Sequence, residues 1–465
     1  MENELRRDIV IRRVTRRLIP FAFICYVVAY IDRVNIAFAA RVLQQDLGLS
    51  ATQYGIGAGL FFLGYCLFEI PSNLVLERVG ARLWIARIMI VWGLVSMATM
   101  FVTDVGSFYI ARVVLGIAEA GFFPGMVLYL TYWIPAADRA RTNALFMTAA
   151  PVSAIIGAPI SEGLLSLNGM MGLHGWQWLF LVEGLPAVLL GMMALMVLTD
   201  RPEQASWLAP ADREWLSRTM REERALRGAV GHASALNSLT SGRVWLLSII
   251  YLMNTSVTYG IFLWLPPMLQ EVAGSSGLGI SVLTAIPFAA ALVAMVLVGR
   301  HSDRTGERKL HVAACALAGA AGLFLAVAFK GNLWLLVLSF TICQVGQRSV
   351  MSVFWAIPPM LFTGSAAAAG IALINSIGNL GGFFGPSVMG WLRDLTGGFS
   401  GGLLVLAGAL LVEAALVSQL RLPTATSDIA KIVRLRSRPL HASSGETRRS
   451  LGDGGPKLPE SPNDL

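Results

Sequence analysis

Long apolar stretches and short polar stretches alternate along most of the chain. We count twelve apolar blocks of about 20 residues, the length that crosses a ~30 Å hydrocarbon core as an α-helix. The apolar residues within each block are continuous, which favours helices over the alternating strands of a β-barrel. The pattern therefore predicts an all-α polytopic membrane protein. The expected spans are 18–40, 54–76, 83–102, 107–132, 144–167, 177–198, 244–269, 280–299, 310–329, 333–362, 367–392 and 401–420.

Composition supports this interpretation. The 465 residues are 55% hydrophobic and 14% charged, and the mean hydropathy is +0.65, whereas a soluble protein carries about a quarter charged residues. The first span follows a basic tail, but it is too long for the apolar part of a signal peptide and lacks a small-residue cleavage site. All four cysteines fall inside expected helices, so we expect no disulfide framework.

The basic residues predict the orientation of the chain in the membrane. Of the 36 Lys and Arg residues, 29 lie in the two terminal tails and in the stretches that follow the second, fourth, sixth and eighth spans. The alternate loops hold only Arg41, Lys330 and Arg393. Positive residues stay in the cytoplasm, so we expect a multi-pass protein of the inner or plasma membrane with both termini cytoplasmic. The formal net charge of +8 then reflects topology, and we expect no nucleic-acid partner.

The chain divides into two halves with matching sequence features. "LERVGAR" (76–82) follows the second span, and "SDRTGER" (302–308) follows the eighth; Glu77 and Asp303 are 226 positions apart. In the fifth and eleventh spans, Pro159 and Pro386 are 227 positions apart. Two recurrences at nearly one offset indicate a duplicated six-helix unit. We therefore expect a cytoplasmic tail (1–17), a six-helix bundle (18–198), a cytoplasmic linker (199–243), a second six-helix bundle (244–420) and a disordered cytoplasmic tail (421–465).

The linker contains one segment with amphipathic character. In "ADREWLSRTMREERALRG", Trp215, Leu216 and Met220 stand among many charges. Such a segment is typical of a helix that lies on the inner membrane surface, and a solvated charged linker is the alternative interpretation.

The repeated acid-Arg-x-Gly-x-Arg loop and the six-helix repeat resemble the major facilitator superfamily of secondary transporters, and more closely its anion:cation symporter family. The resemblance covers roughly residues 18–420. It implies a transporter of a small organic anion: a tartrate-like hydroxy-dicarboxylate, a sugar acid or a phthalate-like acid. The matching stretches are "YIDRVNIAFA" (30–39), "FEIPSNLVLERVGARLWIARIMI" (68–90), "GIAEAGFFPGMVLYLTYWIP" (116–135) and "AAAAGIALINSIGNLGGFFGP" (366–386).

The two repeated loops are candidates for a conformational latch. Gly allows a tight turn, and the charges can pair with neighbouring helix ends in one conformation and release them in another. Ordinary basic-loop topology is the alternative, but it predicts scattered arginines instead of a repeated pattern. The candidate latch residues are Glu77, Arg78, Gly80, Arg82, Asp303, Arg304, Gly306 and Arg308.

Four arginines fall inside the expected spans, where each costs about 2.5–3.5 kcal/mol at a helix centre. Arg87 lies near a cytoplasmic end and can extend its head group out of the membrane. Arg33, Arg112 and Arg348 are deeper and need partners or a water-filled cavity. The acids in the spans are Asp32, Glu69, Glu119, Glu162, Glu183 and Glu413.

These charges suggest anion binding coupled to proton transfer. We expect Arg33 and Arg112 to bind the carboxylate of the anion, and Asp32 and Glu119 to take up and release protons. Burial disfavours an ionised carboxyl group and a nearby guanidinium favours it, so an anion arriving at the arginine can change the affinity of the acid for a proton. The alternative is a set of static buried ion pairs that fix helix packing, which is a costly way to pack helices.

The resemblance implies the same roles for these four residues, because Arg112 and Glu119 keep the family's seven-residue spacing. It also suggests cavity-lining partners for the substrate, each of which has core packing as the alternative. They are Tyr30, Tyr65, Trp355 and Asn375. Arg348 remains open as a second anion contact or as a partner of Glu413 or of another acid.

Other functional classes fit less well. The five histidines show no metal-ligand spacing, no Ser-His or Cys-His grouping is evident, and there is no phosphate loop with a lysine. We therefore expect neither an enzyme nor a metal or other cofactor, and a channel would favour repeated subunits with a filter loop. We expect a monomeric proton symporter that works by alternating access. A membrane receptor without transport and a facilitator without proton coupling stay as alternatives.

Overall fold

The computed structural model of the chain describes residues 2–228, 241–274, 277–362 and 364–420. These residues form α-helices, short 3-10 helices and connecting turns, with no β-strand among them. Eleven of their helices are long and apolar enough to cross a membrane. The all-α polytopic fold predicted from the sequence is thus confirmed. The proposed tail 421–465 and part of the linker lie outside the described residues.

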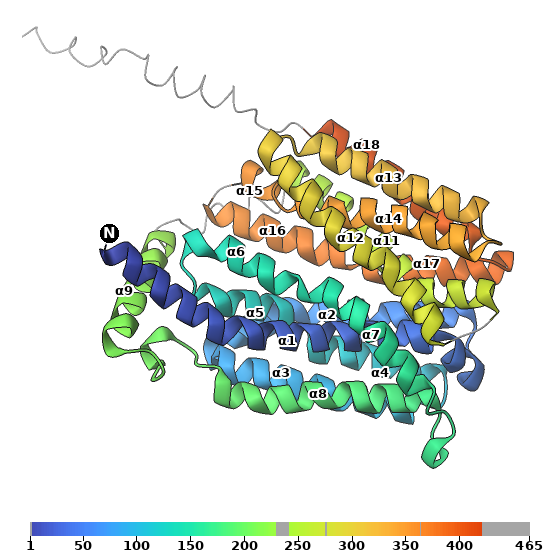
Figure 1. Ribbon diagram of the computed structural model, residues 1–465, viewed down its shortest axis with the longest axis horizontal. Coiled ribbons are helices and arrows are strands. Elements are labelled where there is room, and N and C mark those ends of the chain that lie inside the picture. Colours follow the sequence, from blue (N-terminus) through green and yellow to red (C-terminus); the bar gives the residue numbers. More distant parts are fainter. Residues whose placement is uncertain (1, 229–240, 275–276, 363, 421–465) are drawn as a thin grey trace, which may run out of the picture. The chain divides into compact units, whose positions relative to one another are not determined.

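The first half contains eight α-helices (Figure 1). The fourth predicted span is divided where α4 ends at Glu119, because Gly121 adopts a φ of +87° and lies against Ser72, leaving no room for a Cβ atom. The helices are α1 (Glu2–Leu47), α2 (Ala51–Val79), α3 (Ala81–Ala98), α4 (Val105–Glu119), α5 (Phe122–Thr131), α6 (Ala136–Met147), α7 (Ala149–Leu165) and α8 (Gly175–Val197).

The second half repeats this arrangement, and in Figure 1 its yellow-to-red helices lie beside the blue-to-green helices of the first half. The predicted span 367–392 is divided at Leu380 into two helices of 16 residues each, and it is not among the eleven long helices. The helices are α11 (Gly242–Ala273), α12 (Leu278–Thr305), α13 (Lys309–Ala328), α14 (Leu333–Phe354), α15 (Pro358–Leu361), α16 (Gly364–Asn379), α17 (Gly381–Thr396) and α18 (Ser400–Gln419).

Small residues bring the two halves together along α2 and α17. A Cβ atom at Gly55 would collide with the carbonyl group of Pro386, and one at Gly390 would collide with the carbonyl group of Ala51. Such residues allow two helices to approach backbone to backbone. The halves are therefore in direct contact at the end of the molecule where α2 begins and α17 ends.

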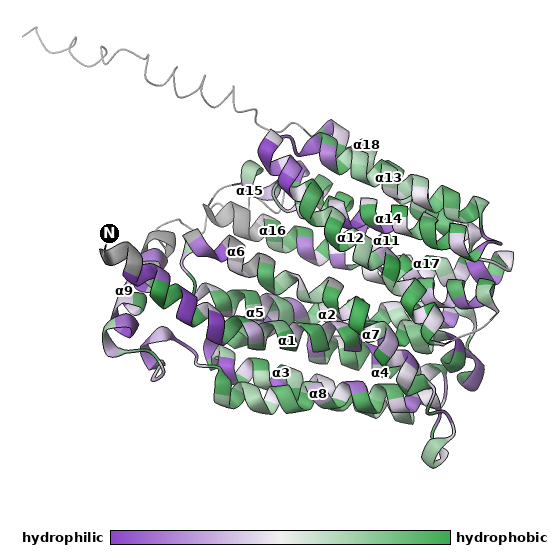
Figure 2. Ribbon diagram, in the orientation of Figure 1, coloured by the Kyte–Doolittle hydropathy of each residue, from purple (hydrophilic) through white to green (hydrophobic). Residues whose placement is uncertain are grey.

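In the linker that joins the two halves in the sequence, α9 (Pro210–Gly228) is the predicted amphipathic helix. Leu216 and Met220 are buried, and Nη1 of Arg13 lies 3.0 Å from a carboxylate oxygen of Asp212. Figure 2 shows hydrophilic residues on α9 and on the part of α1 that follows its grey first turn, whereas the long helices are mainly hydrophobic. Ion pairing thus ties α9 to the N-terminal half, which a free solvated linker would not show; a membrane-surface location stays a prediction.

Candidate functional site

Arg33 on α1 forms a buried ion pair with Glu119, the last residue of α4. The Arg33 side chain is 11% exposed and that of Glu119 is 1% exposed. Aromatic faces complete the surroundings of the guanidinium group, which is a favourable arrangement for a cation out of water. Its central carbon lies 5.1 Å from the ring centroid of Tyr65, 5.2 Å from that of Phe61 and 5.8 Å from that of Tyr30.

Arg112, also on α4, is the second buried guanidinium group. It is 1% exposed, and its central carbon lies 5.2 Å from the ring centroid of Phe61. Among the described residues its Nε and Nη1 have no hydrogen-bond partner. Unpaired buried donors are costly, and the cost is larger for charged groups. Both arginines therefore lie over the ring of Phe61, but only Arg33 is paired with the acid.

Asp32 precedes Arg33 in the sequence but faces another helix, because consecutive residues on a helix point in different directions. Its carboxylate accepts hydrogen bonds from Nε1 of Trp92 at 2.6 Å, from Nδ2 of Asn35 at 3.1 Å and from the hydroxyl of Ser96. Trp92 and Ser96 belong to α3, and all these donors are neutral. Asp32 is 2% exposed. In the sequence Asp32 is next to an arginine, and nothing there indicated that its carboxylate is surrounded by uncharged donors.

Asn375, predicted to bind substrate, contacts the other half of the protein. Its Nδ2 on α16 donates to Oε1 of Glu69 on α2 at 2.9 Å, and the second carboxylate oxygen of Glu69 has no partner among the described residues. Nearby, the thiol of Cys66 lies 3.3 Å from the carbonyl oxygen of Ser376. The sequence analysis counted Glu69 among the acids of the spans but left it out of the site. A carboxylate two residues before Pro71, inside an apolar run, is the feature that could have identified it.

The second half contributes aromatic residues and one cation. Trp355 packs edge-on against Tyr251, with ring centroids 5.0 Å apart. Arg348 lies over the ring of Phe288 at 5.8 Å, and Tyr259 on α11 interacts electrostatically with both Arg33 and Arg348. Arg33 and Arg348 thus approach one tyrosine from opposite halves. Sequence reasoning missed Tyr259, since one tyrosine in an apolar span carries no distinguishing pattern.

Glu413, the alternative partner of Arg348, forms hydrogen bonds with another residue. Glu413 on α18 is fully buried and accepts from Nδ2 of Asn254 on α11, with 3.2 Å to each carboxylate oxygen. Asn254 accepts in turn from Nε2 of Gln347 at 2.8 Å. In the described part of the chain, Arg348 has no ion pair with Glu413, which favours its interpretation as a second cation facing the region between the halves.

The first latch loop connects α2 to α3. Gly80 adopts a φ of +101°, and the backbone N–H of Arg82 donates to Asp200 at 2.8 Å. A Cβ atom at Gly80 would meet that same carboxylate, which accounts for glycine at this position. Glu77 and Arg78 are exposed at the end of α2.

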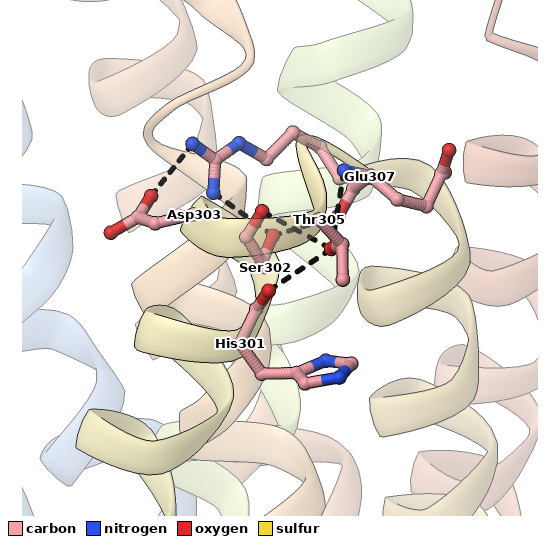
Figure 3. A network of polar contacts seen from close by, with 6 residues as sticks. His301, Ser302, Asp303, Thr305 and Glu307 are labelled. Atoms are coloured by element: carbon pink, nitrogen blue, oxygen red, sulfur yellow. Dashed lines mark hydrogen bonds and ion pairs between the residues drawn. The ribbon is translucent and has the colours of Figure 1, made fainter.

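The second latch loop connects α12 to α13 and is held by a small polar network (Figure 3). Nη2 of Arg308 lies 2.7 Å from Asp303, and Nη1 of Arg308 donates to the hydroxyl of Ser302 at 2.9 Å. Gly306 ends α12 with a φ of +69°, and Arg304 is exposed. The first loop thus contacts the start of the linker, and the contacts described for the second loop stay within the second half. Neither set joins the two halves, so the latch function remains a prediction.

Two helical halves pack closely at one end, and each half buries charged residues, such as Glu119 in the first and Glu413 in the second. Outward-facing apolar side chains such as Leu67, Ile110 and Met196 are more than half exposed, as expected for residues that face lipid. This combination defines a polytopic membrane protein with charged residues inside its helical bundle.

Comparison with known proteins identifies the family. The sequence profile of the Major Facilitator Superfamily matches residues 22–386 and 247–444, and the chain belongs to this family of transporters. It is 51% identical over 407 residues to a protein of Agrobacterium vitis named "Putative tartrate transporter", covering 88% of this chain and 90% of the relative. It is 43% identical to "Putative metabolite transport protein NicT" of Pseudomonas putida, covering 87% and 93% of the two chains.

Solved structures agree on the fold. The inward open conformation of the xylose transporter XylE from E. coli superimposes with a TM-score of 0.71, at 15% sequence identity, covering 91% of this chain and 99% of that one. At this identity the likeness concerns the fold alone. The relatives are named as transporters, and the protein is a transporter rather than an enzyme.

Proposed function

We propose that the protein is a proton-coupled symporter of a small organic anion, with a hydroxylated dicarboxylate such as tartrate as the leading candidate. The observation that supports this most strongly is Arg112, a buried guanidinium group with two nitrogens that lack a partner among the described residues. Each of these nitrogens can donate a charge-assisted hydrogen bond to a carboxylate oxygen of an anion. The tartrate transporter named among the relatives agrees with this chemistry.

Proton coupling follows from competition for Arg33. In the structure Arg33 is paired with Glu119. Arg33 and Arg112 both lie over the ring of Phe61, so an anion bound at Arg112 can also contact Arg33. When the anion takes the Arg33 contact, Glu119 loses the cation that stabilised its charge. A buried carboxylate without a cation binds a proton. When the anion leaves, Arg33 and Glu119 form their ion pair again, and Glu119 releases its proton.

Asp32 provides a second site for a proton. The hydroxyl of Ser96 donates to the ionised carboxylate and can accept from the protonated form by rotating its own hydrogen. Trp92 and Asn35 hold the group in place in both states. Movement of the two halves around this site then exposes it to each side of the membrane in turn. We propose that the transporter acts as a monomer with both termini in the cytoplasm.

Proteoliposomes containing the wild-type protein or Glu119→Gln test the coupling. Glutamine keeps the shape of the side chain but cannot exchange a proton, so we expect the variant to retain counterflow of labelled tartrate and to lose accumulation driven by a pH gradient. Counterflow without accumulation in the wild type would indicate a facilitator. Binding without counterflow would indicate a receptor. Accumulation that survives in Glu119→Gln would remove Glu119 from the mechanism.

A further inference from the structure

A polar cavity lies apart from the buried arginines, where the ends of α1, α11 and α17 meet. Its volume is about 440 Å³, within the range of small-molecule pockets. Both halves of the protein contribute to it. It is lined by Arg41, Gln44, Gln45, Pro267, Gln270, Glu271, Gly274 and Arg393.

The charges of this cavity are unusual for the face on which it lies. The loops that the sequence places outside the membrane hold only three basic residues, Arg41, Lys330 and Arg393. Two of these three line the cavity. An excess of cations there is not explained by topology, because positive residues are otherwise kept on the cytoplasmic side.

Arg41 and Arg393 differ in whether they are paired with a carboxylate. Arg41 is exposed and has no carboxylate partner among the residues that the structure describes. Nη2 of Arg393 lies 3.0 Å from Oε2 of Glu271, and its guanidinium carbon lies 4.4 Å from the ring centroid of Phe399. Arg41 is therefore available to an anion at once, whereas Arg393 must be shared with Glu271.

Three carboxamides complete the lining and suit a hydroxylated ligand. Gln270 is only 4% exposed although it borders the cavity. Gln44 donates to the backbone carbonyl of Ala40 at 2.9 Å, which fixes its orientation. Amide side chains both donate and accept hydrogen bonds, so they match hydroxyl groups beside a carboxylate.

We propose that this cavity is an outer vestibule that binds the organic anion before the two halves open. The inference rests on the proposed function and on the predicted orientation of the chain. Cations at the mouth of a transport path raise the local concentration of an anionic substrate, and salt weakens this attraction. Arg393 is also next to Asp394, whose carboxylate accepts from the backbone N–H groups of Ala51 and Thr52 in the other half. The vestibule thus lies directly against a contact that joins the halves.

Kinetics of labelled tartrate uptake test the vestibule, with Arg41→Gln as the variant and Lys330→Gln as the matched control. Both changes remove one outer cation, but Lys330 is not in the cavity lining. We expect Arg41→Gln to raise KM roughly two- to fivefold, the effect of one exposed charge contact, with an unchanged maximal rate. We expect Lys330→Gln to behave as wild type. Raising the ionic strength from about 0.05 M to about 0.3 M should raise KM more for the wild type than for Arg41→Gln. Equal KM values for all three proteins would overturn the proposal.

A binding measurement separates failure of the vestibule from failure of the proposed transport. Saturation-transfer NMR of tartrate is measured on full-length Arg112→Ala protein in detergent, in which the central site is disabled. We expect transfer in Arg112→Ala and its loss in the double variant Arg112→Ala/Arg41→Gln. Loss of transfer in Arg112→Ala itself would overturn the vestibule even if the wild type transports tartrate. Transfer that depends on Arg41 would support it even if no uptake is found.

Discussion

Phe61 contacts two guanidinium groups that differ in their partners. Arg33 has an acid and three aromatic rings around it, whereas Arg112 has Phe61 and two nitrogens without partners among the described residues. A transporter needs one cation that is free to attract the anion and another whose present partner the anion can displace. This asymmetry is the physical basis of the proposed coupling.

The clearest prediction at the scale of one residue concerns Arg112. Replacing Arg112 with Ala should weaken tartrate binding at least about 30-fold, since removing a buried charged contact costs ~2 kcal/mol or more. Arg112→Lys should weaken it less, because lysine keeps the charge but loses the fork geometry. Isothermal titration of the purified variants measures both effects. Wild-type affinity in Arg112→Ala, with an intact fold by thermal unfolding, would contradict the assignment.

The sequence predicted which residues carry charge into the membrane but not how they pair. A spacing of seven places Arg112 and Glu119 on one face of α4, and that much follows from helix geometry. The partner of Glu119 is Arg33, on a helix 86 positions away in sequence. Residue spacing within a helix holds no information about which neighbouring helix lies opposite, so this pairing required the structure.

At the scale of helices, acids of one half hold helix ends of the other half. Asp394 near the end of α17 accepts from the N–H of Ala51 at 3.0 Å and from that of Thr52 at 2.7 Å, at the start of α2. Glu162 on α7 interacts in a similar way with the backbone of Gly277 at the start of α12. Carboxylates stabilise helix N-termini, so these contacts close one end of the molecule.

Asp394→Ala should loosen this end. We expect faster amide hydrogen exchange at the start of α2, because the N–H groups of Ala51 and Thr52 lose their acceptor, and Asp394→Asn should have a smaller effect. Unchanged exchange at the start of α2 in Asp394→Ala would show that the contact does not hold the halves together.

Asp104 provides a matched control within one half. Its carboxylate accepts from the N–H groups of Gly106 at 2.7 Å and Ser107 at 3.0 Å, at the start of α4. The hydrogen bond from the backbone of Ser107, followed by those from the Ser107 hydroxyl and the backbone of Gly106, keeps the pKa of Asp104 below its ordinary value. The stabilisation is therefore present above the unfolded-state pKa and is lost as pH falls through the lowered one. Asp104→Ala should speed exchange at the start of α4 and leave α2 unchanged.

Helix positions followed well from the sequence, whereas helix breaks did not. Continuous apolar runs predicted the spans, but the runs 107–132 and 367–392 are each divided in the structure. Gly121 takes a positive φ beside Ser72, and Gly381 lies so close to Thr255 that a side chain would collide. Glycine in an apolar run is compatible with either a continuous or a broken helix, so only the packing partner decides.

At the scale of the whole molecule, the two halves meet around one group of charges. Arg33, Glu119 and Arg112 come from the first half, Arg348 comes from the second, and Glu69 is joined to Asn375 across the boundary. The duplication visible in the sequence predicted two similar halves. Which side chains meet at their boundary depends on tertiary packing, which is why Glu69 and Tyr259 emerged only from the structure.

The central claim is that an anion displaces Glu119 from Arg33 and that Glu119 then takes up a proton. The most direct measurement is the pH change of a weakly buffered solution when tartrate binds to the purified protein. The account predicts proton uptake of about one per bound anion by the wild type and its loss in Glu119→Gln, with tartrate binding retained. Binding by the wild type without any proton uptake, or the same uptake in Glu119→Gln, would contradict it.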